Sequence, residues 1–222
     1  MHPLKYRLKS ATLFVKSMFC ADGHEAAFHI QNDCATDTAA VVLSGDGGWR
    51  NFAKEITDGF YSNEYNTLGI DMLRYCWSYK APSQIVSDII TQLDQLPPFN
   101  KLVICGYSFG ANCIPFFFKE LENKVAAELK FILLAPSAKI DFEIKLSSVV
   151  FDIPGSVDVL DKLITMPMDN TLIITDDSKF SIHERLNTMR INNVKVSGGH
   201  HFKGHMQQVS KEIDCFVVDT YR

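Results

Sequence analysis

The chain has 222 residues, of which 46% are hydrophobic, and its formal net charge at pH 7 is −4. This length and apolar content predict one folded domain with a substantial core and exclude a disordered chain. The weak negative charge, without any Lys/Arg cluster, argues against nucleic acid as a partner. No apolar run approaches the roughly 18 residues of a membrane-spanning helix.

Six short apolar segments, each bounded by turn residues, predict the strands of a buried sheet. Each is apolar on both faces, as is typical of strands in a parallel sheet covered on both sides. In chain order they are residues 39–44, 65–71, 101–106, 129–137, 171–177 and 193–198.

Helical patterns separate these strands. They cover residues 51–60, 82–96, 109–124, 181–190 and 204–221. The alternation predicts one α/β domain over residues 1–222, with a mostly parallel, doubly wound sheet, helices on both faces and the ligand site at the carboxyl ends of the strands.

Two regions fall outside this alternation. Residues 1–38 form an N-terminal region for which no element is predicted. Residues 138–170 are a candidate lid or insert, because the segment FEIKLSSVV at 142–150 alternates apolar and polar residues as a half-exposed strand or extended segment would.

A serine between two glycines stands where the strand at 101–106 meets the helix at 109–124. In Gly106-Tyr107-Ser108-Phe109-Gly110, a tight strand-to-helix turn would expose the Ser108 hydroxyl at a helix N-terminus, and the glycines remove side chains that would clash there. Helix N-termini stabilise negative charge, such as that developing on a bound carbonyl oxygen. The pattern predicts that Ser108 is a catalytic nucleophile, against the alternative of a glycine-rich turn without chemistry.

A serine nucleophile requires a base and an acid that orients the base. Asp176 and Asp177 end one predicted strand, and His200 and His201 follow the last, which reproduces the Ser, Asp, His order of α/β hydrolases. We favour His201 as the base because it precedes an aromatic residue, Phe202, and Asp177 as the acid. Asp176 stays open as the acid, because adjacent residues at a strand end point in opposite directions and the register is uncertain by one residue.

A second glycine-rich loop, SGDGGW at residues 44–49, ends the first core strand. It lacks the Lys-Ser/Thr pair of a nucleotide-binding loop. In an α/β hydrolase this loop supplies one N–H of the oxyanion hole, here assigned to Asp46, and the residue after the nucleophile, Phe109, supplies the other.

Charged and aromatic side chains around these loops form a predicted substrate-binding set. The Asp46 carboxylate could turn outward to meet a substrate cation, and Arg74 could neutralise Asp46 or bind a substrate phosphate. The alternative for the charged members is a local ion-pair network. The set comprises Asp46, Trp49, Asp71, Arg74 and Tyr107.

No metal site and no organic cofactor are predicted. His201 and His205 are four residues apart, but no Glu-containing zinc motif accompanies them.

Five motifs together resemble the VirJ/AcvB family of bacterial α/β hydrolases. In order they are SGDGGWRNF, GIDMLRYCW, GYSFGANCIPF, FEIKLSS and SGGHHFKG, spread over about residues 39–205. The combination is much more specific than the serine motif alone.

The resemblance implies a periplasmic serine hydrolase associated with virulence or envelope function. AcvB-like members hydrolyse the aminoacyl ester of lysyl-phosphatidylglycerol, which implies a lipid ester substrate and peripheral contact with a membrane. VirJ-type members are associated with secretion machinery, which implies as the alternative a non-catalytic docking or chaperone-like subunit. Another acyl ester or a thioester is a further alternative substrate. We expect either no standard export signal in the first 23 residues, because Lys16 interrupts their apolar stretch, or a signal that has been trimmed.

Overall fold

The computed structural model describes residues 27–33, 36–145, 155–179 and 181–218. Its centre is a seven-stranded sheet in which every neighbouring pair is parallel except β1 with β3. The strand order is β1 (Phe28–Gln31), β3 (Asn66–Ile70), β2 (Thr38–Leu43), β4 (Lys101–Tyr107), β5 (Glu128–Leu134), β8 (Thr171–Thr175) and β9 (Val194–Lys195). The predicted α/β class and mostly parallel sheet are confirmed.

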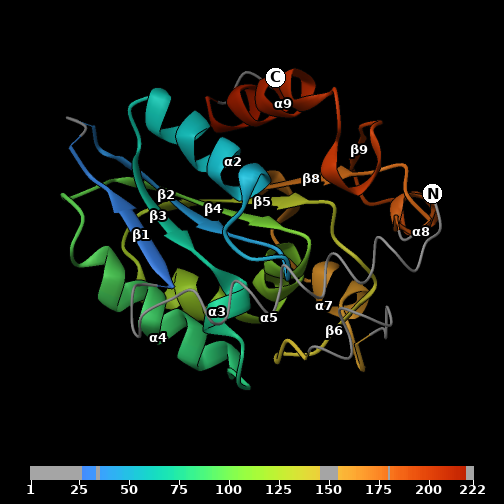
Figure 1. The fold of residues 1–222 in the computed structure, drawn as a ribbon, viewed down its shortest axis with the longest axis horizontal. Coiled ribbons are helices and arrows are strands. Elements are labelled where there is room, and N and C mark those ends of the chain that lie inside the picture. Colours follow the sequence, from blue (N-terminus) through green and yellow to red (C-terminus); the bar gives the residue numbers. More distant parts are fainter. Residues whose placement is uncertain (1–26, 34–35, 146–154, 180, 219–222) are drawn as a thin grey trace.

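Helices cover both faces of this sheet (Figure 1). Helices α2 (Asn51–Ser62) and α9 (Met206–Val217) lie on one face, and α4 (Pro82–Leu93) and α5 (Phe109–Lys124) lie on the other. Alternate strand residues enter two separate cores: Val41 packs in the core that includes the α4 and α5 residues, and its neighbour Val42 packs in the core with α2 and α9. Burial on both faces explains why the strands read as continuous apolar runs.

The predicted strands and long helices are present, with ends displaced by a few residues. Strand β1 was not predicted, since it is a half-buried four-residue edge strand that depends on pairing with β3. Three short helices were also missed or shortened: α3 (Met72–Tyr75), α7 (Leu160–Leu163) and α8 (His183–Thr188).

The insert between β5 and β8 begins with a small two-stranded antiparallel sheet of β6 (Lys139–Ile140) and β7 (Val157–Asp158) and ends with the 3-10 turn η1 (Met168–Asn170). Phe142 and Ile144 are buried, as their alternation predicts, but they form no strand. Instead, the Ile144 N–H donates to the Cys76 carbonyl (2.8 Å), and the Lys80 N–H donates to the Phe142 carbonyl (2.9 Å). Residues 146–150 of the predicted extended segment lie outside the described residues.

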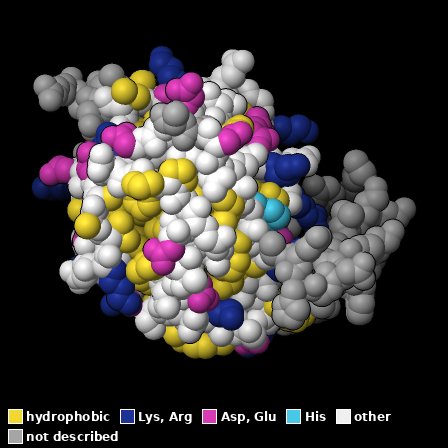
Figure 2. Space-filling view, turned by 90° about the vertical axis from the view of Figure 1, so that its left-hand side faces the viewer, with side chains coloured by type: hydrophobic (Ala, Val, Ile, Leu, Met, Phe, Trp, Pro, Cys, Tyr) yellow, Lys and Arg dark blue, Asp and Glu magenta, His cyan; other side chains and the backbone are white. Residues whose placement is uncertain are grey.

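Hydrophobic side chains gather on the side of the molecule where the α4–β4 connection lies (Figures 1 and 2). A cavity of about 400 Å³ lies between that connection and the end of α5, with Leu93, Pro98 and Val125 among its lining residues. A second cavity, of about 320 Å³, is lined by residues of β1 and α2 together with Trp49. Neither cavity is lined by Ser108. Among the described helices, none is both long and apolar enough to span a bilayer.

Candidate active site

Ser108 lies in the turn between β4 and α5 with φ 51° and ψ −111°. Positive φ is unusual for a residue with a side chain and is a form of strain found at functional sites. The Ser108 N–H donates to the Leu134 carbonyl of β5 (2.8 Å), which holds the turn against the sheet. A Cβ on Gly106 would lie 2.6 Å from the Ala111 nitrogen, and one on Gly110 would lie 2.4 Å from the Leu43 oxygen. Both flanking positions therefore require glycine, as the sequence predicts.

The Ser108 hydroxyl faces an imidazole from the other end of the chain. The Nε2 atom of His200 lies 2.8 Å from Ser108 Oγ, and the Nδ1 atom of His200 lies 2.7 Å from Asp176 Oδ2. Because a carboxylate only accepts, Nδ1 carries the proton and Nε2 of the neutral ring is left as an acceptor for the Ser108 hydroxyl. The three side chains form one hydrogen-bonded chain.

Asp176 follows β8 directly and is only 2% exposed. Its Oδ1 accepts from the Ser178 N–H (3.0 Å) and the Ser178 hydroxyl (2.8 Å). Burial alone would raise the pKa of Asp176, but the hydrogen bonds from His200 and Ser178 outweigh burial and lower this pKa. Sequence reasoning missed Ser178, although a serine two residues after an aspartate is the spacing of an Asx turn.

The lowered pKa of Asp176 predicts how stability changes in acid. An aspartate has a pKa of about 3.9 in the unfolded chain, so the ionised carboxylate stabilises the fold above that pH, and this contribution is lost as pH falls through the lower folded-state pKa. We expect the free energy of unfolding, measured with urea at several pH values, to fall more steeply below about pH 4 in the wild type than in Asp176→Asn. Equal slopes would contradict the role of this carboxylate.

The contacts predicted for His201 and Asp177, the favoured members of the two adjacent pairs, were wrong. His201 is exposed, and its Nδ1 lies 2.7 Å from the Tyr107 hydroxyl rather than against Ser108. Asp177 accepts from the Gly199 N–H (2.6 Å) rather than from an imidazole. The neighbours His200 and Asp176 make the contacts instead.

The shape of the histidine loop explains the error. The turn η2 (Gly199–His201) is followed by Phe202, which is fully buried and has φ 48°. Burial of Phe202, 5.9 Å from the Phe52 ring between centroids, anchors the loop. His200 then faces Ser108 while His201 stays exposed. The aromatic residue marks the loop but not which histidine faces inward.

The glycine-rich loop after β2 is tied to the start of α5, because the Gly110 N–H donates to the Ser44 carbonyl (3.1 Å). Asp46 is exposed in a turn closed by the Gly48 N–H and the Gly45 carbonyl. Desolvation of its carboxyl group raises the pKa of Asp46, and His200 and the N–H groups of Asp46 and Gly47 offset only part of this rise. Phe109 is the first residue of α5, so its N–H has no acceptor within the helix.

Asp71 and Arg74, which were predicted to bind substrate, contact each other. Asp71 is buried and caps α3, accepting from the Leu73 (3.1 Å) and Arg74 (3.3 Å) N–H groups. The Arg74 Nε atom lies 3.5 Å from Asp71 Oδ2, which is the ion pair left open as the alternative.

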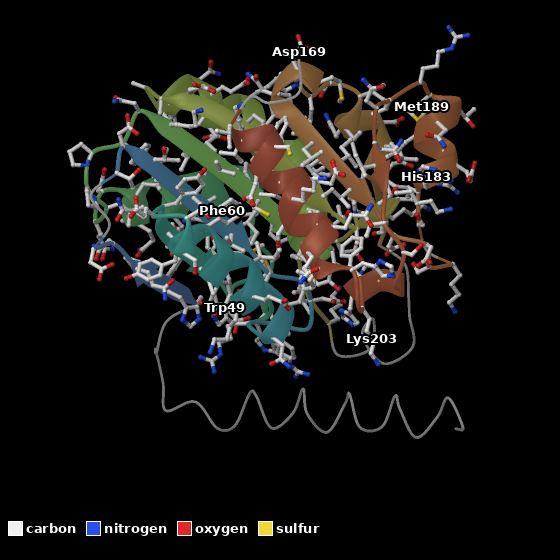
Figure 3. The ribbon with its side chains drawn as sticks, turned by 90° about the horizontal axis from the view of Figure 1, so that it is seen from above. Trp49, Phe60, Asp169, His183, Met189 and Lys203 are labelled. Carbon is white, nitrogen blue, oxygen red and sulfur yellow. The ribbon has the colours of Figure 1, made fainter. Side chains whose placement is uncertain are left out.

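Trp49 stacks on the His29 imidazole, with centroids 4.6 Å apart, and lies over Gly69, where a Cβ would be 2.0 Å from the indole. Seen from above, Trp49 and Lys203 lie on one side of the molecule and Asp169, just before β8, on the other (Figure 3). The loops after the strands therefore gather along one edge. No group of three or more His, Cys, Asp or Glu side chains suited to a metal occurs among the described residues.

A mostly parallel sheet with a strained serine turn between strand and helix, followed by an acid and a histidine after later strands, defines an α/β hydrolase fold. A family model for the bacterial virulence protein VirJ matches residues 37–217. The chain therefore belongs to the VirJ family, as its motifs predicted. No curated protein sequence matches it.

Solved structures with this fold include two thioesterases. Est1E from Butyrivibrio proteoclasticus has a TM-score of 0.59 at 13% identity, covering 86% of this chain and 93% of its own. The type II thioesterase YbtT of the yersiniabactin pathway has a TM-score of 0.55 at 14% identity, covering 86% and 97%. The thioesterase domain of the curacin pathway has a TM-score of 0.55 at 13% identity, covering 84% and 93%. These likenesses show the fold.

Proposed function

We propose that this protein is a serine hydrolase of carboxylic esters or thioesters, with Ser108 as nucleophile, His200 as base and Asp176 as the acid that orients the base. The observation that carries the proposal is the unbroken chain from Ser108 Oγ to His200 (2.8 Å) to Asp176 (2.7 Å). Such a chain activates a hydroxyl that is otherwise a poor nucleophile near neutral pH. Thioesterases with the same fold support this reaction class.

In the first step, Ser108 Oγ attacks the carbonyl carbon while His200 Nε2 takes the hydroxyl proton. The carbonyl electrons move onto oxygen, which the N–H groups of Phe109 and Asp46 stabilise. Collapse of this intermediate expels the alcohol or thiol, which receives the proton from Nε2. Water then attacks the acyl-enzyme with His200 again as base, releasing the acid and Ser108. Asp176 accepts from Nδ1 throughout and stabilises the imidazolium.

The more specific substrate we propose is the aminoacyl ester of lysyl-phosphatidylglycerol, as the family resemblance implies. Its ammonium group would be of opposite charge to an ionised Asp46, whose carboxyl group interacts electrostatically with His200 and His201 and therefore lies near the site. A lipid substrate also requires peripheral contact with a membrane surface.

A hydrolysis panel on the purified chain tests both levels of the proposal. We expect covalent labelling by a fluorophosphonate, and faster hydrolysis of lysyl-phosphatidylglycerol in vesicles than of alanyl- or unmodified phosphatidylglycerol. If the protein cleaves only a short acyl ester or an acyl thioester, the hydrolase assignment stands and the proposed lipid substrate is wrong. An unlabelled protein inactive on every substrate would overturn the hydrolase and favour the alternative of a docking subunit in a secretion system.

A further inference from the structure

The loop that carries His200 is held by two hydrogen bonds on either side of the peptide that joins Gly199 to His200. The Gly199 N–H donates to Asp177 Oδ1 at 2.6 Å. The His200 carbonyl accepts from the Tyr107 hydroxyl at 3.0 Å. Both partners neighbour members of the Ser108–His200–Asp176 chain in sequence, since Tyr107 precedes Ser108 and Asp177 follows Asp176. The turn at the nucleophile and the turn at the acid therefore each hold the histidine loop.

Tyr107 is suited to this contact because its side chain is buried and packed against another ring. The residue is 7% exposed, and its ring packs 4.2 Å from the Phe52 ring between centroids. Burial, with the nearby Asp46 and Asp176 carboxylates, raises the pKa of Tyr107, so the phenol keeps its proton. Since a carbonyl only accepts, that proton goes to the His200 oxygen, and the phenol oxygen then accepts from Nδ1–H of His201, 2.7 Å away. His201 thus completes the hydrogen bonding of the Tyr107 hydroxyl and makes no hydrogen bond to Ser108.

Asp177 makes the second contact from an exposed position. The Gly199 N–H, followed by other nearby backbone groups, lowers the pKa of Asp177, so its carboxylate stays ionised in mild acid. A hydrogen bond from a backbone N–H to a charged acceptor is stronger than one between neutral groups. Asp176 is therefore hydrogen-bonded to the imidazole of His200, and Asp177 is hydrogen-bonded to the backbone beside that residue.

We propose that Tyr107 and Asp177 are positioning residues that hold the 199–201 loop so that His200 Nε2 stays within reach of Ser108 Oγ. The inference rests on the proposed function. Neither side chain would touch the reacting carbonyl. Each acts through the backbone on either side of the Gly199–His200 peptide, and a displacement of about 1 Å at a reacting group can cost about 100-fold in rate.

Kinetics of single variants test the proposal. Tyr107→Phe and Asp177→Ala are each expected to lower kcat and the rate of fluorophosphonate labelling about 10- to 100-fold, with KM nearly unchanged. Asp177→Asn keeps an acceptor oxygen and should recover most of the rate. A change in KM at constant kcat for Tyr107→Phe would instead assign it to substrate binding and overturn the positioning role.

Matched controls and a second background separate positioning from loss of stability. Tyr65→Phe removes a hydroxyl at a remote, partly buried position, and Asp37→Ala removes a carboxylate that accepts from Asn100 beside the start of β2. Both should retain wild-type rates. If Tyr107 and Asp177 act only through His200, then adding either substitution to His200→Ala should lower the residual rate no further. A further loss of similar size in that background would overturn the proposal.

A readout without turnover keeps this inference distinct from the proposed function. The Nδ1–H proton of His200, hydrogen-bonded to Asp176, should give a downfield NMR resonance that broadens or disappears in Tyr107→Phe and Asp177→Ala but persists in both controls. The wild type could be inactive and unlabelled while its resonance still depends on Tyr107 and Asp177. That result would contradict the hydrolase function but support the positioning of the loop by these two residues. An unchanged resonance together with unchanged kcat would overturn the positioning role itself.

Discussion

Replacing Ser108 by alanine is expected to abolish hydrolysis and fluorophosphonate labelling, with a loss on the order of 10⁶-fold in kcat if Ser108 is the nucleophile. Among the described residues, no other hydroxyl is hydrogen-bonded to the His200 imidazole. The fold should remain, because the substitution removes one partly exposed oxygen and leaves the packing of Gly106 and Gly110 intact. The expected change in the free energy of unfolding is within about 1 kcal/mol.

Turnover, labelling and urea denaturation of the same preparation check this prediction. Ser87→Ala is the matched control, because Ser87 is an exposed serine on α4, on the other face of the sheet from α2 and α9. It should label and turn over at the wild-type rate. Substantial hydrolysis by a folded Ser108→Ala variant would sink the assignment of the nucleophile.

The adjacent histidines provide the second large expected effect. His200→Ala should lower kcat on the order of 10⁶-fold, because Ser108 loses the acceptor 2.8 Å from its oxygen. His201→Ala should retain the rate within about tenfold, since it removes the hydrogen bond to the Tyr107 hydroxyl but leaves the Tyr107 bond to the His200 carbonyl.

The two variants are each other's control, because they remove the same ring from consecutive positions of one loop. Steady-state kinetics of both, with circular dichroism to establish folding, decide between them. A severe loss in His201→Ala with a mild loss in His200→Ala would reverse the assignment and restore the pairing that the aromatic at Phe202 suggested.

Sequence reasoning performed best where a residue's local surroundings dictate its role. The run from Gly106 to Gly110 specifies a turn that only glycines can flank, and β2, β4 and β5 are recognisable because both of their faces are buried. Short elements that depend on residues distant in the chain were predicted least well. Strand β1 exists through its pairing with β3, and the 142–144 segment is extended through hydrogen bonds to residues 76 and 80.

The sequence by itself determined the α/β architecture, the VirJ family, the serine turn and the two dipeptides that contain the proposed acid and base. Only the tertiary structure decided which member of each dipeptide faces Ser108. Adjacent side chains at the end of β8 and in the 199–201 turn point in different directions, and local pattern carries no information about which direction is inward. The histidine loop is in contact with Tyr107 and Asp177, which we propose orient it, and Tyr107 lies 94 positions from His201 in the chain.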